Sequence, residues 1–105
     1  MPDDVHPSAV SADLASLLHR AAGGDERAFA SLYDATAPRV FGLVFGVLRD
    51  RAQAEDVARE TYLEIWRRAE RFEHQGGTAI AWMIAIAHRQ AVTRVRTPSL
   101  HRQAW

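Results

Sequence analysis

The stretch AEDVARETYLEIWR, which runs from Ala54 to Arg67, decides the fold. Its apolar side chains recur at steps of three and four, and this spacing predicts an α-helix over about residues 52–71. The other face of this helix is charged, and its buried face is expected to contain Val57, Ala58, Thr61, Tyr62, Ile65, Trp66 and Ala69. No stretch of the chain alternates with period two for long enough to predict a sheet. The fold class is therefore predicted to be all-α.

Three further helices are predicted by the same spacing. The first covers about residues 13–22 and ends at a Gly-Gly pair. The second begins after Asp25, a good N-cap, and a kink or a break is expected at Pro38 because proline removes one helical hydrogen bond. The last begins after Thr78, reaches Arg96 and is apolar nearly all round in its first half.

These helices are expected to form one compact bundle of about four helices over residues 13–97. Residues 1–12 are predicted to be a disordered tail, and residues 98–105 a second tail or the start of a linker. The remaining core is expected from Leu14, Leu17, Leu18, Phe29, Leu32, Tyr33, Thr36, Val40, Leu43, Val44, Val47, Ile80, Ile84, Ala87, Ala91 and Val95.

The composition is that of a folded domain, with 48% hydrophobic and 25% charged residues. The sequence has no cysteine, which excludes a disulfide framework and a thiolate metal site. No secretory signal is recognisable, and the longest run without a charged or polar side chain, residues 79–87, is about half of what a membrane-spanning helix needs. We therefore expect a cytoplasmic protein that does not insert into a membrane.

The net charge of zero conceals an asymmetry along the chain. Residues 1–73 hold all 13 acids and nine arginines, so their balance is 9 − 13 = −4, whereas residues 74–105 hold four arginines and no acid. A basic segment is typical of phosphate contact, and an acidic one repels nucleic acid or meets a basic protein surface. The alternative is a basic end that is merely solvated.

Three carboxylates, those of Asp56, Glu60 and Glu64, are spaced by four along the third predicted helix. Like charges at this spacing oppose each other by roughly 0.2–0.5 kcal/mol per pair, and arginines nearby can offset the repulsion: Glu55 can reach Arg59, and Glu64 can reach Arg67 or Arg68. The row is either a solvated face or a docking strip for an arginine-rich partner. A metal site is disfavoured because no Glu-x-x-His pair accompanies the carboxylates, and we expect no cofactor.

The polar connection before the last helix is the second candidate site. It consists of Phe72, Glu73, His74, Gln75, Gly76 and Gly77. Glycines let a backbone approach a ligand closely, and the side chains beside them can read an unstacked base. His88, Arg89, Thr93 and Arg96 follow on the last helix, where arginines could hold phosphates. The alternative is an ordinary connecting turn, and Trp82 can equally be a core residue or a support for a base.

Three blocks of the sequence resemble region two of the extracytoplasmic-function sigma factors. They are DERAFASLY from Asp25, AEDVARETYLEIWR from Ala54 and IAWMIAIAHRQAVTRVR from Ile80, and they occur in the family's order. The resemblance covers roughly residues 13–96, and the His-Arg pair of the last block is most similar to the sigma-K type of actinobacteria.

The resemblance implies that the domain binds RNA polymerase core and opens promoter DNA without catalysing a reaction. It assigns Asp56, Arg59, Glu60 and Glu64 to the clamp helices of the beta-prime subunit. It assigns the loop of residues 72–77 to a flipped base of the minus-ten element, and His88, Arg89, Thr93 and Arg96 to the same single strand and its upstream duplex. It also implies an anti-sigma factor as a partner.

The sequence departs from the family pattern at three of these positions. Arg59 stands where many members have Gln, His88 where many have Asn, and Thr93 where many have Asp. The family also adds a second helical domain that reads the minus-thirty-five element, and residues after Arg96 are too few to form it, so we expect an isolated domain of a longer factor. Two other hypotheses remain: a helical protein-interaction module held by a regulator without DNA contact, and a helical enzyme, for which no catalytic constellation is apparent.

Overall fold

The structure, a computed structural model, describes residues 7–73 and 76–96. These residues form four α-helices and one short 3-10 helix, listed in chain order as α1 Pro7–Ala22, α2 Glu26–Leu48, α3 Arg51–Arg68, η1 Ala69–Arg71 and α4 Ala79–Arg96. No strand occurs in the described residues. The all-α prediction is therefore confirmed.

Side-chain caps fix where three of the helices begin. Asp25, Asp50 and Thr78 precede α2, α3 and α4, and each side chain accepts a hydrogen bond from the backbone N–H three residues later, at 3.0, 2.9 and 3.2 Å. Such caps satisfy N–H groups that have no partner inside the helix. The bond from the Ala28 N–H also lowers the pKa of the Asp25 carboxyl.

The helix boundaries differ from the prediction in three places. α1 begins at Pro7, so part of the tail expected over residues 1–12 is helical; proline fits the first turn, where its missing N–H is not needed. Of the two alternatives expected at Pro38, a kink or a break, the break does not occur, because α2 continues through Pro38 as one helix. The third helix ends in the tighter turn η1. Residues 1–6 and the tail predicted at 98–105 lie outside the described residues.

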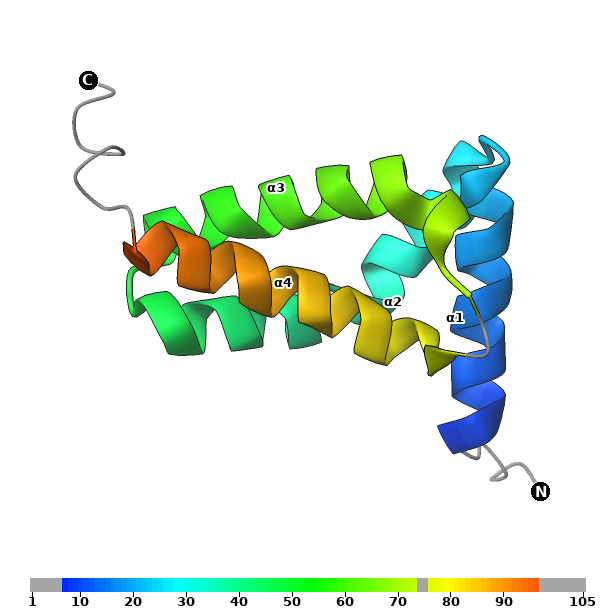
Figure 1. The fold of residues 1–105 in the computed structure, drawn as a ribbon, viewed down its shortest axis with the longest axis horizontal. Coiled ribbons are helices and arrows are strands. Elements are labelled where there is room, and N and C mark those ends of the chain that lie inside the picture. The colour runs from blue at the N-terminus through cyan, green and yellow to red at the C-terminus, as the bar shows by residue number, and fades with distance from the viewer. Residues whose placement is uncertain (1–6, 74–75, 97–105) are drawn as a thin grey trace.

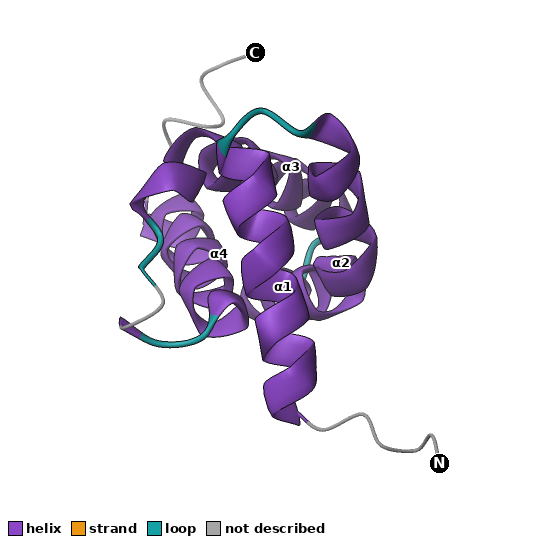
Figure 2. Cartoon of the chain, turned by 90° about the vertical axis from the view of Figure 1, so that its right-hand side faces the viewer, coloured by secondary structure: helices purple, strands orange, loops and turns teal. Residues whose placement is uncertain are grey.

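The helices α3 and α4 run antiparallel along the long axis of the molecule, and α2 lies beside both of them (Figure 1). α1 crosses one end of this group, where it contacts α2, η1 and α4. The view turned by 90° shows α1 in front, with α2 and α4 on either side of it (Figure 2). The connection that leaves η1 and enters α4 therefore lies at the end of the bundle that α1 covers.

The core lies between the four helices, and most of its members were predicted. Side chains that are fully buried there include Leu18, Leu32, Val40, Val44, Val57, Ile65 and Met83. Tyr33 and Val95 were predicted in the core as well, but they are 47% and 51% exposed. The inward face of α4 is Ala79, Met83, Ile86, Ala87 and Ala91, so only Ala87 and Ala91 of the predicted stripe are fully buried, and Ile80 and Ile84 are partly buried. The first half of this helix is apolar nearly all round and therefore does not reveal which face is buried.

One polar contact crosses the core between α2 and α3. The Thr36 hydroxyl donates to the carbonyl of Leu32 at 2.8 Å, so the Tyr62 hydroxyl, 2.6 Å away, donates to Thr36. Burial raises the pKa of Tyr62, although the bond to Thr36 opposes the rise. Both buried hydroxyls are thereby satisfied, and the bond fixes how α2 and α3 face each other.

Candidate functional site

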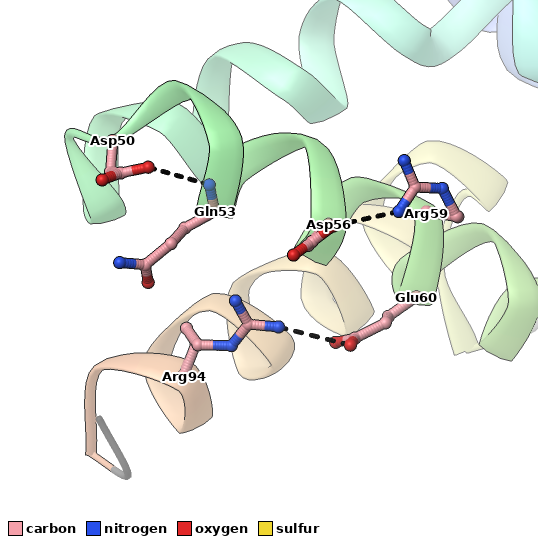
Figure 3. A network of polar contacts seen from close by, with 6 residues as sticks. All are labelled: Asp50, Gln53, Asp56, Arg59, Glu60 and Arg94. Carbon is pink, nitrogen blue, oxygen red and sulfur yellow. Dashed lines mark hydrogen bonds and ion pairs between the residues drawn. The ribbon is translucent and has the colours of Figure 1, made fainter. Parts of the chain in front are cut away.

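The predicted acidic row lies on the exposed surface of α3 over most of its length. Asp56, Arg59 and Glu60 have side chains that are 48%, 68% and 52% exposed. Arg59 pairs with Asp56 at 3.0 Å within the helix, and Arg94 of α4 donates to Glu60 at 3.3 Å (Figure 3). Asp56 and Arg59 thus pair with each other within their own helix, whereas Glu60 is tied to a neighbouring helix.

The arginines that offset the acidic repulsion are partly those expected. Arg68 pairs with Glu64 at 3.1 Å, as the spacing of four predicts. Glu55 does not pair with Arg59; it pairs with Arg51 at 3.3 Å, one turn before it. Arg59 pairs instead with Asp56, which lies three residues before it on the same helix.

Glu64 is the member of the row with the most contacts, and only 13% of its side chain is exposed. Its Oε2 accepts from Arg89 of α4 at 2.7 Å, and its Oε1 accepts from the side-chain amide of Gln90. Together with Glu60, Arg68 and Arg94, these residues form what we term the α3–α4 seam. The acidic and basic surfaces, which the sequence suggested were separate, therefore share a border.

The electrostatics of Glu64 follow from this crowding. Burial alone raises the pKa of its carboxyl, but the hydrogen bonds from Gln90 and Arg89 and the charges of Arg89 and Arg68 outweigh burial, so the pKa lies below its usual range. Glu64 is therefore ionised at neutral pH.

A groove of about 710 Å³ lies between α2 and α3. Aromatic rings line it: the ring centroids of Phe29 and Trp66 lie 5.1 Å apart in an edge-to-face arrangement, and those of Tyr33 and Tyr62 lie 4.6 Å apart with the rings tilted. Arg59 lines it, together with Phe29, Tyr33, Ala37, Pro38, Phe41, Arg51, Glu55, Ala58, Tyr62, Leu63 and Trp66. Tyr33 and Leu63 are 47% and 48% exposed, so this α2–α3 groove presents apolar surface to the solvent.

A smaller pocket of about 390 Å³ lies where η1 leads into α4. This loop pocket is lined by Arg71, Phe72, Glu73, Gly76, Thr78, Ala81, Trp82 and Ala85. The rings of Phe72 and Trp82 meet edge to face with centroids 5.7 Å apart, and both are half-buried against the core. Trp82 thus packs against the core and also lines the pocket, and its role as a support for a base stays a prediction.

The predicted basic face of α4 begins at this pocket. Ala81 and Ala85 line the pocket, and Arg89, Thr93 and Arg96 follow at steps of four and three on the same exposed line of the helix, with His88 beside it. His74 and Gln75 were also predicted to contact DNA, and they lie outside the described residues. Gly77 has φ +134°, a conformation that L side chains rarely adopt, so glycine is required where the chain enters α4.

Comparison with known proteins identifies the family. Residues 32–99, more than half of the chain, match the family Sigma-70 region 2. The chain belongs to the Sigma-70 region 2 family. The ECF RNA polymerase sigma factor SigK of Mycobacterium tuberculosis H37Rv is 51% identical over 90 residues, which are 86% of this chain and 48% of that protein.

Two further SigK proteins extend the same comparison. The one from Mycobacterium ulcerans is 47% identical over 90 residues, 86% of this chain and 48% of the relative. The one from Mycolicibacterium vanbaalenii is 43% identical over 88 residues, 84% of this chain and 45% of the relative. The resemblance to the sigma-K type is therefore confirmed. The chain spans about half the length of these curated relatives.

Three structural features of this region 2 domain were not predicted from the sequence. Arg94, with 9% of its side chain exposed, and Gln90 join α4 to α3, and the α2–α3 groove is open although its aromatic rings had been interpreted as core. Spacing within one helix could not reveal Arg94 or Gln90, because their partners are on another helix. The surplus of large aromatic residues on the α2 and α3 stripes was the available signal for the groove.

Neither a membrane crossing nor a metal site is found in the part of the chain that the structure describes. Over residues 7–73 and 76–96, none of the helices has the length and apolar character that a membrane crossing requires. Over the same residues, no three side chains of His, Cys, Asp or Glu gather as metal ligands.

Proposed function

We propose that this region 2 domain binds RNA polymerase core through α3 and captures the minus-ten element as a single strand through the loop pocket and α4. The observation that carries the proposal is the continuity of the loop pocket with the exposed line of Arg89, Thr93 and Arg96 on α4. A nucleotide in the pocket would leave the adjoining phosphates beside these arginines. The pocket would then supply base contacts, and the arginines would supply affinity that depends on salt.

Promoter opening in this proposal is driven by binding and not by catalysis. Extruding a base costs a few kcal/mol. Stacking of a base on an aromatic side chain contributes about 1–3 kcal/mol, so Phe72 and Trp82 in the pocket wall could offset the extrusion. Base pairs that are open by fluctuation would be held open by this capture.

The polymerase contact is proposed for the outer surface of α3. Asp56, Arg59 and Glu60 are exposed there, and Arg59 also lines the α2–α3 groove, so charged and apolar surface are continuous. The clamp helices of the beta-prime subunit would dock on this surface. Glu64 was predicted in the same contact and stays a prediction.

The experiment compares three partners: RNA polymerase core, a single-stranded non-template oligonucleotide carrying a minus-ten element, and the same sequence as a duplex. Fluorescence anisotropy with the full 105-residue chain should show binding to polymerase and tighter binding to the single strand than to the duplex. Equal affinity for both DNA forms, or no binding to polymerase, would contradict the proposal.

Two charge variants separate the surfaces. Asp56→Arg places a positive charge on the outer face of α3 and should weaken binding to polymerase while sparing DNA. Arg96→Ala removes an exposed cation from the end of α4 and should weaken DNA binding while sparing polymerase. If both variants lost both activities together, the two surfaces would not be distinct.

A second candidate function is favoured by the groove alone. The open α2–α3 groove is also suited to a regulator that binds this domain without touching DNA, such as an anti-sigma factor. Replacing Arg89 and Arg96 with Ala discriminates the two functions, because promoter opening is lost only if α4 contacts DNA. Under the leading proposal, the domain acts in the cytoplasm together with the polymerase.

A further inference from the structure

Glu64 differs from every other carboxylate on α3 in how it is held. Glu55 and Glu60 are each 52% exposed, and each pairs with one arginine. Glu64, in contrast, is 13% exposed and accepts from Arg68, Arg89 and Gln90. Two of these donors belong to α4 and one to α3. Glu64 is therefore placed to fix side chains across the helix interface.

The charges at this point do not balance. Arg89 and Arg68 share one oxygen of Glu64, at 2.7 and 3.1 Å, so one carboxylate serves two guanidinium groups. Replacing the carboxylate with a neutral group would leave two like charges side by side. Arg89 would then leave its present orientation and move into solvent, since 54% of its side chain is already exposed.

We infer that Glu64 is a positioning residue that holds Arg89 for a single strand leaving the loop pocket and withholds its charge from duplex DNA. The inference rests on the proposed function. Arg89 follows Ala85, a pocket residue, by one helical turn, so a guanidinium fixed there meets the phosphate next to a captured base. Phosphates of a duplex follow a different path and meet a cation that is already paired.

The physical basis is that phosphate contacts raise affinity without reading sequence. A freely rotating Arg89 would contact any phosphate nearby and would release one further counterion from the DNA. When Glu64 holds it, Arg89 contributes mainly to the affinity for the strand that the pocket has aligned. Glu64 would thus increase the preference for single-stranded over duplex DNA.

The test uses Glu64→Gln, which keeps the shape and a hydrogen-bond acceptor while removing the charge. Affinities for the single strand and for the duplex are measured from about 50 to 200 mM salt. Duplex affinity should rise by up to about tenfold at the lowest salt, and its salt dependence should steepen by about 0.9 in log–log slope. Affinity for the single strand should change less, because Arg89 becomes free to contact phosphates but is no longer held toward the strand in the pocket.

Three further variants make the outcome specific. In an Arg89→Gln background, Glu64→Gln should have no additional effect on duplex binding, since the effect passes through Arg89. Glu55→Gln removes the same charge from an exposed site on α3 and should leave the ratio of the two affinities unchanged. Glu64→Asp keeps the charge and should keep the wild-type slope, and it serves if the Gln variant does not fold.

The possible results decide between this inference and the proposed function. Suppose that the wild type prefers the single strand. If Glu64→Gln then changes neither the ratio of the two DNA affinities nor the salt slope of duplex binding, the inference is wrong and the proposed function stands. The same conclusion follows if Glu64→Gln has an equal effect on both quantities in the Arg89→Gln background. If the wild type shows no preference between DNA forms, both are wrong. A loss of polymerase binding in Glu64→Gln with unchanged DNA binding would instead make Glu64 a docking residue.

Discussion

The two sides of α3 hold their charges in different ways. On the side of the α2–α3 groove, Asp56 pairs with Arg59 and Glu55 with Arg51, in both cases within the helix. On the side of α4, Glu60 and Glu64 pair with arginines of another helix, in the α3–α4 seam. Exposed pairs within a helix contribute only a few tenths of a kcal/mol. They leave their charges available to a partner, whereas pairs between helices also determine how the helices sit on each other.

The difference suggests a division of labour within one helix. The groove side offers apolar surface and accessible charge, which suits a protein partner. On the seam side, Glu64 is committed to α4 and supports the proposed DNA surface from behind, whereas Glu60, which is 52% exposed, also belongs to the proposed polymerase contact. A change in the core of α3 should therefore damage both sides, and a change on one side should damage only that side.

The largest effect is expected from Ile65→Ala, which removes a fully buried side chain of α3. Loss of burial and the remaining cavity should lower the free energy of unfolding by about 2–5 kcal/mol. Polymerase and DNA binding should fall together. Urea denaturation followed by circular dichroism measures the stability, and selective loss of one activity would contradict a shared core.

The next largest effect is expected from Gly77→Ala at the entry to α4. The φ of +134° is strained for any residue with a Cβ, so the cost should be about 1–3 kcal/mol even though no atom obstructs the new methyl group. The loop pocket should be distorted, and single-strand binding should fall while polymerase binding is retained. Gly24→Ala, at φ +97° and equally unobstructed but outside the loop pocket, is the matched control: it should lose stability and keep single-strand binding.

Tyr62→Phe should have a smaller effect, on the groove side. It removes the bond to Thr36, whose hydroxyl keeps its bond to Leu32, so the free energy of unfolding should fall by about 0.5–1.5 kcal/mol. Because Tyr62 lines the groove, polymerase binding should weaken more than DNA binding. Equal weakening of both, measured by anisotropy, would argue that α2–α3 packing supports both sides.

The smallest effect concerns acid. The folded-state pKa of Glu64 lies below its unfolded value, so the unfolded chain binds more protons and the stabilising contribution is lost as the pH falls through the folded pKa. Denaturation between about pH 5 and pH 3, below the usual pKa of Glu, should show a shallower loss of stability in Glu64→Gln than in the wild type. The same slope in the wild type and in Glu64→Gln would remove Glu64 from the acid response.

Much of this structure was predictable from the sequence where the physics is local. The caps at Asp25 and Thr78 and the pair of Glu64 with Arg68 depend on neighbours along the chain, and they were predicted. On the inward face of α4, Ala87 and Ala91 were predicted but Ala79, Met83 and Ile86 were not, because apolar residues surround the first half and only packing against other helices decides which are buried.

The candidate site, too, was predictable only where its features depend on spacing within one helix. The exposed line of α4 and the acidic row of α3 follow from helical spacing, but the pairs of Glu64 with Arg89 and of Glu60 with Arg94 join residues 25 and 34 positions apart. No periodicity within one helix encodes such a contact. The register of α4 on α3 sets it, and that register results from the packing of the whole core.

Two of the three tryptophans lie on the two proposed binding surfaces, the α2–α3 groove and the loop pocket. Trp66 lines the α2–α3 groove, and Trp82 forms a wall of the loop pocket. Indole emission responds to the solvent around the ring, so each can act as an optical reporter of its own surface. In single-tryptophan variants, also lacking Trp105, stopped-flow fluorescence could time polymerase docking and base capture separately, without any attached dye.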